Sequence, residues 1–538
     1  MQILRTVLVL TLVVVPALVL SAQDRPEKLG TVHFPVSCAS GTQPLFDRAV
    51  ALLHSFHYPE TLKAFQAVIA LDPSCAMAYW GLAIAQRPNP IVGPFDAATL
   101  RRGAEALEKA RATGPKTARE RDFIAALETF FRDPDKPDHQ ARVLAYERAM
   151  EGVSARHPQD AEAAIFYALA LNEAVDPLDT TFARQLKAGA ILEKVLATQP
   201  DHPGVAHYII HSYDFPPLAT RGLPAARQYA ALAPSAPHAL HMPSHIFSMV
   251  GSWHEAIAAD TAAVAAYRDY AARNNLGGAV VGELHSLDFL TYAYLQTAQD
   301  REARRVVDER NAIQKFAPPF RVTGDTAFAA VPVRYVLERG RWNEAAALEL
   351  RPTQYPQAEA VTRFGRGLGL ARTGDLAGAR REIDALQGLR DTLAQGKQIY
   401  WAEQVDVQRR AVAAWVARAE GQSAEAVTLL RSAADLEDRS AKHVAMENRL
   451  FPMRELLGDL LLELGEPVQA LAEFEASLKN APNRFRSFHG AALAAQRTGD
   501  LARARAHYER LVALAARGDS ERPELSQARA FLAALAPR

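Results

Sequence analysis

The sequence has no net charge, so it gives no electrostatic indication of a partner. Its 538 residues include 61 Lys and Arg and 61 Asp and Glu. A protein that attracts nucleic acid or an anionic membrane over long distances needs an excess of basic residues. We therefore expect no nucleic-acid partner. With 49% hydrophobic and 23% charged residues, the composition is typical of a folded globular protein and excludes a largely disordered chain.

Cysteine is scarce, and the common catalytic motifs are absent. Cys38 and Cys75 are the only two cysteines and form no C-x-x-C pair, which excludes the usual zinc, haem-attachment and thiol-exchange motifs. The sequence also contains no G-x4-G-K-[ST] phosphate loop, no G-x-S-x-G nucleophile motif and no H-E-x-x-H motif. The two cysteines form one disulfide or are separate buried side chains; spacing leaves both open, because a disulfide needs Cα atoms within about 7 Å of each other.

Long apolar runs are absent except at the N-terminus. Arg5 precedes an apolar stretch over residues 6–20, and Ser21 and Ala22 follow it, in the order of a basic region, a hydrophobic region and a small-residue cleavage site. The stretch is shorter than the roughly twenty residues that span a bilayer. We predict that residues 1–22 are a signal peptide, that the mature protein is periplasmic or secreted, and that it has no membrane-spanning segment.

What the sequence has in abundance is helix-forming residues, arranged as a repeat. Ala, Leu, Arg and Glu dominate, and Gly and Pro fall between amphipathic stretches of about twelve residues, which is typical of helical hairpins. Residues 451–484 and 485–518 have the same pattern of small and aromatic residues one period apart, as in Gly465 and Gly499 or Phe474 and Tyr508. This pattern resembles the 34-residue tetratricopeptide repeat (TPR). The resemblance implies an all-α fold, a right-handed superhelical solenoid of antiparallel helix pairs.

Weaker copies of the repeat extend over the rest of the chain. A Gly-x4-Ala pattern marks the expected turns within helix pairs at Gly251, Gly340, Gly374 and Gly421. Spacing is irregular in the middle of the chain. We predict a degenerate N-terminal TPR-like array with a histidine-rich groove over residues 23–313 and a more regular C-terminal TPR array over residues 325–538, each repeat packing against its neighbours.

Histidines gather in the N-terminal array. Eight of the 16 lie between His202 and His285, and two H-x3-H pairs occur, at positions 207 and 211 and at positions 241 and 245. Residues four apart lie on one face of a helix, so each pair can chelate one ion. In TPR proteins the equivalent positions line the concave groove. The resemblance therefore implies that six candidate metal ligands face one cavity: His207, His211, His241, His245, His285 and Asp288.

The chemistry of this set leaves several uses open. Histidine with one carboxylate suits Zn, Fe, Mn, Ni or Cu. The same side chains can instead form a hydrogen-bonded network inside the solenoid or contact a bound ligand or peptide directly. Four nearby groups are candidates to orient the ligands or transfer protons: Tyr208, Asp214, Glu283 and Tyr292.

The text around the histidine pairs, over residues 202–214 and 236–247, resembles a group of exported bacterial TPR proteins of undefined activity, and the likeness covers roughly residues 30–300. Two hypotheses about function remain. The first is an exported TPR scaffold that binds a protein or peptide partner in its concave groove. The second is a metal-binding protein or metal-dependent enzyme that uses the paired H-x3-H motifs. The sequence alone leaves the oligomeric state open.

Overall fold

The computed structural model describes residues 27–136, 138–318, 321–440 and 448–535. The predicted signal peptide, residues 1–22, lies outside the described residues. The regular structure of the described part is helical, with a single β-bridge between Ala279 and Phe316. None of the described helices has both the length and the apolar character to cross a membrane.

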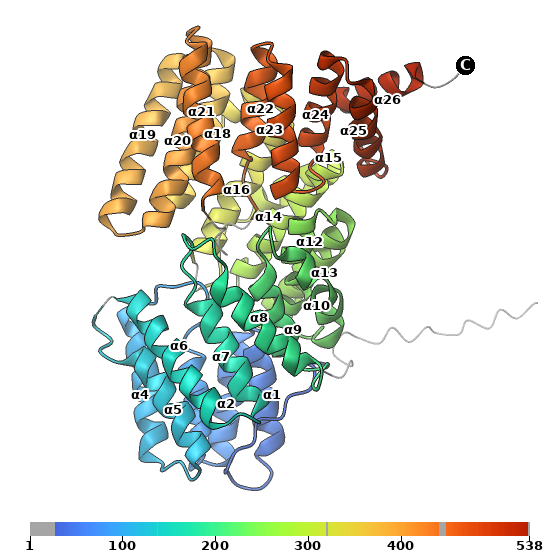
Figure 1. The fold of residues 1–538 in the computed structure, drawn as a ribbon. Helices are drawn as coiled ribbons and strands as arrows, with labels where there is room; N and C mark the ends of the chain where they lie inside the picture. The colour runs from blue at the N-terminus through green and yellow to red at the C-terminus, as the bar shows by residue number, and fades with distance from the viewer. Residues whose placement is uncertain (1–26, 137, 319–320, 441–447, 536–538) are drawn as a thin grey trace, which may run out of the picture.

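The helices follow one another along the chain in antiparallel pairs (Figure 1). Those of the first half are α1 (Gln43–His54), α2 (Tyr58–Leu71), α3 (Ala76–Ile84), α4 (Ala97–Ala112), α5 (Ala118–Phe131), α6 (His139–Arg156), α7 (Ala161–Glu173), α8 (Ala183–Leu196), α9 (Pro203–Tyr213), α10 (Ala219–Leu232), α11 (Pro237–His241), α12 (Pro243–Val250) and α13 (Trp253–Arg273). Those of the second half are α14 (Val281–Gln296), α15 (Asp300–Ala312), α16 (Val322–Glu338), α17 (Trp342–Ala346), α18 (Pro356–Thr373), α19 (Leu376–Gln395), α20 (Ile399–Ala419), α21 (Ser423–Asp438), α22 (Met453–Glu463), α23 (Pro467–Asn480), α24 (Phe485–Thr498), α25 (Leu501–Leu514) and α26 (Pro523–Ala534).

The two clearest predicted repeats are helix pairs, α22 with α23 and α24 with α25. A Cβ atom on Gly458 or on Gly490 would lie within 2.7 Å of the Phe474 ring, so the small residues let the helices approach around the aromatic side chain. Gly465 and Gly499 join the two helices of each pair with φ near +80°, a conformation that glycine adopts without strain. These contacts confirm the TPR-like, all-α fold.

The weaker copies of the repeat have the same turns. Gly251, Gly340, Gly374 and Gly421 each follow a helix and have positive φ. The Gly-x4-Ala pattern therefore predicted four helix-pair turns correctly.

The solenoid curves until distant repeats touch, which the sequence did not predict. In the first half α1 contacts α9, and the Tyr270 hydroxyl on α13 donates to Glu60 on α2. In the second half Arg484, just before α24, donates to the Tyr292 hydroxyl on α14. The prediction that repeats pack only against their neighbours is thus wrong, since the curvature brings helices from opposite ends of an array together.

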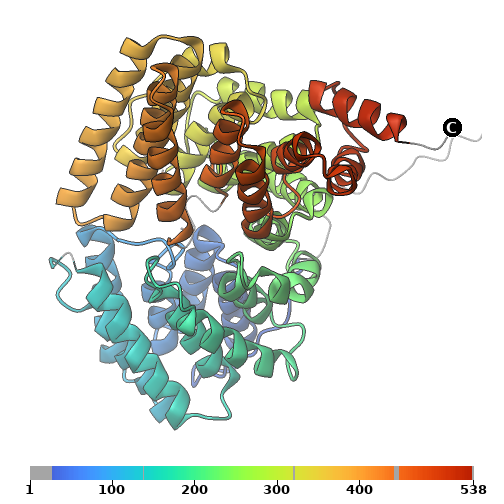
Figure 2. The ribbon, with the colours of Figure 1, turned by 45° about the horizontal axis from the view of Figure 1, so that its top comes forward.

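The helices up to α13 (blue to green) occupy one part of the molecule and those from α18 onward (yellow to red) another, with α14 and its neighbours between them (Figures 1 and 2). One buried apolar cluster runs from Leu29 to Ala293 and a second from Val264 to Ala504. The division into arrays at residues 314–324 stays a prediction.

Cys38 and Cys75 form a disulfide with a Cα to Cα distance of 4.9 Å. It links the segment before α1 to the N-cap residue of α3, directly before that helix. The sequence left open a disulfide or two separate buried cysteines, and the structure contains the disulfide.

Candidate metal centre

The predicted histidines converge where α9, α11, α12 and α14 meet. Each H-x3-H pair places its ring centroids 4.8 Å apart, as expected for positions on one helical face. The second pair spans a break in the helix, because Pro243 starts α12 directly after α11 has ended. The imidazoles form two groups of three, and in each group the three ligand atoms lie within 4.8 Å of one another. We call them the α9 group (His207, His211, His238) and the α12 group (His241, His245, His285).

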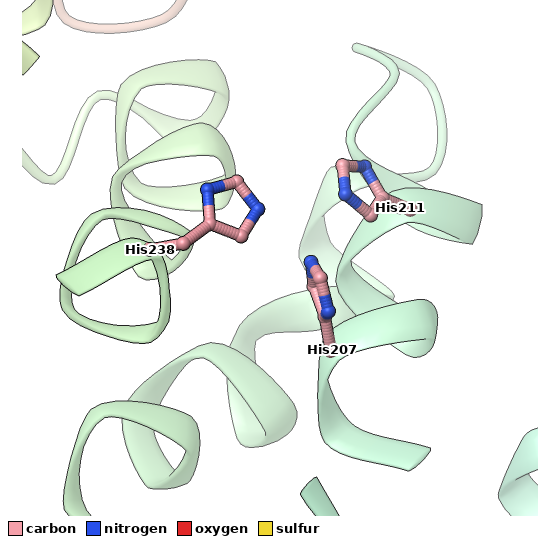
Figure 3. Close-up of side chains that lie close together, drawn as sticks. All are labelled: His207, His211 and His238. Carbon is pink, nitrogen blue, oxygen red and sulfur yellow. The ribbon is translucent and has the colours of Figure 1, made fainter. Parts of the chain in front are cut away.

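The α9 group encloses a common space between α9 and α11 (Figure 3). His207 Nδ1 lies 2.6 Å from the carbonyl oxygen of His54, so this nitrogen carries the proton and Nε2 presents a lone pair. Among the described residues the buried Nε2 atoms of His207 and His238 have no hydrogen-bond partner. Leaving such an atom buried without a partner costs about 1–3 kcal/mol. The geometry therefore favours an occupant that accepts their lone pairs.

The α12 group is held by carboxylates. His241 Nδ1 lies 2.6 Å from Asp260 Oδ1, and His245 Nδ1 lies 3.1 Å from Asp214 Oδ2. Carboxylate oxygens accept from ring N–H groups, so both Nδ1 atoms donate to these carboxylates. The Nε2 atoms of His241 and His245 lie 2.9 Å apart. Two lone pairs at that distance repel unless a proton or a cation lies between them.

Asp214 also connects the two groups. Its Oδ2 atom lies 3.5 Å from His211 Nδ1 in the α9 group, while it accepts from His245 in the α12 group. A carboxylate, carbonyl or water at the second ring nitrogen is the usual way in which proteins orient a metal-binding histidine. Four of the six imidazoles thus have an oxygen atom facing Nδ1.

A phenylalanine closes each group. The Phe56 ring centroid lies 4.4, 5.9 and 5.5 Å from the ring centroids of His207, His211 and His238. Phe56 itself has φ of +50°, which is uncommon for a bulky residue. Phe289 is placed in the same way in the α12 group, 5.0–5.2 Å from all three rings. The apolar rings keep the imidazoles in a buried environment.

Burial keeps these histidines neutral. It lowers the pKa of His207, His238 and His241 well below the ordinary value of 6.5, and the neighbouring imidazoles lower the pKa further. Neutral imidazole is the form that binds metal ions.

Five of the six imidazoles are buried, and that of His238 is half-buried. His207, His241 and His245 are at most 1% exposed. The prediction of a concave groove that presents these imidazoles to a partner therefore needs correction: the imidazoles converge as predicted, but within the solenoid wall. The physical reason is the curvature that places α1 and Phe56 against α9.

Asp288 does not belong to this centre. Both of its carboxylate oxygens accept from the guanidinium of Arg334, at 2.8 and 3.1 Å, and it is absent from every group of ligand atoms within 4.8 Å in the described residues. The repeat register predicted that Asp288 faces the same cavity as His285. The Asp288 carboxylate instead pairs with Arg334 of α16.

Of the four predicted accessory groups, Asp214 lies against His211 and His245, and the Tyr208 ring contacts the His207 ring with 5.1 Å between centroids. The Glu283 carboxylate accepts from Arg268, and the Tyr292 hydroxyl accepts from Arg484. The Tyr208 hydroxyl lies 3.0 Å from His54 Nδ1 in a separate network.

That separate network consists of His54, Glu162 and His202, all buried. The two oxygens of Glu162 each lie 3.0 Å from an Nε2 atom, one of His54 and one of His202. Although burial favours the neutral acid, the two imidazoles hold the pKa of Glu162 below its usual range. The network adjoins the α9 group, because the carbonyl of His54 fixes His207.

Sequence reasoning missed four members of the centre: Phe56, His238, Asp260 and Phe289. His238 had a signal, since it lies one helical turn before His241. Phe289 also had one, since it lies four residues after His285 on the same helix, whereas Asp260 and Phe56 had none, because only the fold brings them alongside.

Comparisons with known proteins give no family assignment. The sequence matches no protein-family model, and no curated protein matches it. Among solved structures, human IFIT1 in a dimer with m7Gppp-AAAA is 12% identical, covering 82% of this chain and 90% of that chain with a TM-score of 0.39. Naa15 in its complex with Naa10 and HypK is 14% identical, covering 91% of this chain and 73% of that chain with a TM-score of 0.23. Likeness this low supports no argument about function.

Proposed function

We propose that this protein is an exported helical scaffold that binds transition-metal ions in the buried histidine centre. The observation that carries the proposal is in the α9 group: His207 Nδ1 faces a carbonyl oxygen, while the buried Nε2 atoms of His207 and His238 have no hydrogen-bond partner among the described residues. A network made only for packing would pair each Nε2 lone pair with a donor. A metal ion satisfies several lone pairs at once.

The donor set narrows the choice of metal. Neutral imidazoles suit Zn, Cu, Fe and Ni, whereas Mn prefers carboxylate and water. Asp214 and Asp260 face Nδ1 atoms and act as orienting groups, so they do not supply the oxygen ligands that Mn needs. Of the five metals predicted from the sequence, Mn fits this centre least well.

The direct test is the metal content of protein purified without a polyhistidine tag from several growth media. We expect stoichiometric Zn, Cu, Fe or Ni in the parent protein and a loss of metal in His245→Ala. His33→Ala serves as the control, since His33 has a largely exposed side chain and lies outside the centre. The proposal is refuted if the parent protein contains no stoichiometric metal in any medium and takes up no added ions.

Export is supported by the N-terminal sequence pattern and by the disulfide, which persists in oxidising compartments. N-terminal sequencing of the mature protein should start close to Gln23, and the protein should appear in the periplasmic or secreted fraction. An intact N-terminus in the cytosolic fraction would refute export.

Binding of a protein or peptide partner stays a prediction. The scaffold hypothesis rests on the resemblance to TPR proteins and does not depend on the histidines. A cavity of about 280 Å³ lies between the two halves, where Tyr292, Phe364 and Phe451 contribute to its wall, and this is where a peptide partner would be sought.

A further inference from the structure

The two histidine groups are built to the same plan. Each has an H-x3-H pair with 4.8 Å between ring centroids, a third imidazole supplied by a helix later in the chain, and one phenylalanine that contacts all three rings. In both groups Nδ1 atoms face oxygen acceptors. Such duplication is expected if each group performs the same task separately.

One ion cannot engage all six imidazoles at once. Metal to nitrogen bonds are about 2.0–2.1 Å long, so the nitrogens around one ion lie within about 4.2 Å of one another. The sets of ligand atoms within 4.8 Å each contain three residues, and the set that joins the two groups takes one histidine from each, His211 and His245, with the Asp214 carboxylate between their Nδ1 atoms. Across the groups, the ring centroids of His211 and His245 are 5.8 Å apart, and those of His238 and His241 are 6.2 Å apart.

We infer that the protein holds two metal ions side by side, one in each three-histidine group, with a small anion bound between them. This inference rests on the proposed metal-binding function. It assigns His238 to the first ion and His285 to the second, and it makes Asp214 the carboxylate that orients one ligand of each ion.

Charge balance gives the class of the additional ligand. Two divalent ions bring four positive charges, while the carboxylates that contact the imidazoles, Asp214 and Asp260, bring two negative charges. Buried uncompensated charge is costly. Three imidazoles leave at least one coordination position open on each ion. Hydroxide or another small anion that bridges the ions fills these positions and compensates part of the charge.

The test uses the full mature chain, stripped of metal and loaded with Cu(II) at equilibrium, followed by removal of loosely bound copper with a weak chelator. We expect two copper ions per parent chain, one in His238→Ala, one in His285→Ala and none in the double variant. His489→Ala is the matched control, because His489 is half-buried like His238 and bonds to Gln527 outside the centre. His238→Asn and His285→Asn replace the alanine variants if thermal melts show that these do not fold.

Electron paramagnetic resonance gives an independent readout. Neighbouring Cu(II) ions couple, so the parent should show a weak or broadened signal, whereas each single variant should show the full signal of an isolated ion. Titration with azide should saturate at one azide per two copper ions in the parent.

The outcomes separate the two proposals. No tightly bound copper in the parent overturns metal binding altogether. One copper per parent chain, lost in His238→Ala as well as in His285→Ala, leaves metal binding intact and overturns the paired centre. Two copper ions with uncoupled signals, or with one azide bound to each ion, overturn the bridging anion.

Discussion

Replacing Asp260 by Asn should weaken one of the two bound ions and leave the other unchanged. Asp260 is fully buried on α13, and its Oδ1 atom accepts from His241 Nδ1 at 2.6 Å. The substitution keeps the shape of the side chain and removes its charge. An amide oxygen at this position makes a weaker, neutral hydrogen bond, and an amide nitrogen would drive the proton of His241 to Nε2 and block the metal-binding atom.

The expected loss of metal affinity follows from the role of Asp260 as a group that orients a metal-binding histidine. Loss of the group that orients a metal-binding histidine typically lowers metal affinity by 10–100-fold, which corresponds to about 1.4–2.7 kcal/mol. Asp260 lies against His241 of the α12 group, whereas Asp214 lies against one histidine of each group. Asp260→Asn should therefore weaken one dissociation constant, and Asp214→Asn should weaken both.

Competition with a chromogenic chelator measures both dissociation constants, with Cu(II) as the ion. Asp269→Asn is the control on the same helix, since Asp269 is exposed and pairs with Arg273. The reasoning is refuted if Asp260→Asn binds both ions with the affinity of the parent protein, or if it weakens both to the same extent.

Three further predictions concern stability. Because burial lowers the pKa of imidazoles in the centre below 6.5, the metal-free protein should have its full stability above pH 6.5 and lose up to about 1.4 kcal/mol per pH unit and group as the pH falls below it; urea unfolding that is unchanged between pH 7 and pH 5 would contradict this. Reduction of the Cys38–Cys75 disulfide, which closes a loop with a sequence separation of 37, should lower the free energy of unfolding by about 4 kcal/mol on the loop-entropy model, and a double serine variant with unchanged stability would refute the estimate. Arg484→Leu should destabilise the protein by about 3–5 kcal/mol, because it leaves the buried carboxylates of Glu338 and Glu455 without their guanidinium; an unfolding midpoint equal to that of the parent would show that these carboxylates are protonated or repaired by solvent.

The local parts of the centre were predictable because helical spacing is a local property. Two histidines four residues apart on a helix face the same way in any tertiary context, and both pairs do so here. The repeat register extended the argument to His285, three helices further along the chain. It failed at Asp288. A register position predicts which way a side chain points but not which residue pairs with it, and Asp288 pairs with Arg334 of α16.

The sequence by itself determined the helical class, the repeat and its glycine turns, and the two histidine pairs, since all of these depend on periodicity within a few tens of residues. Only the tertiary structure decided that the solenoid curves until α1 meets α9, that Asp260 lies against His241, and that the imidazoles form two groups of three. The physical reason is that curvature is the sum of small rotations over many repeats. No single repeat encodes it, yet it sets which side chains from distant helices share a buried space.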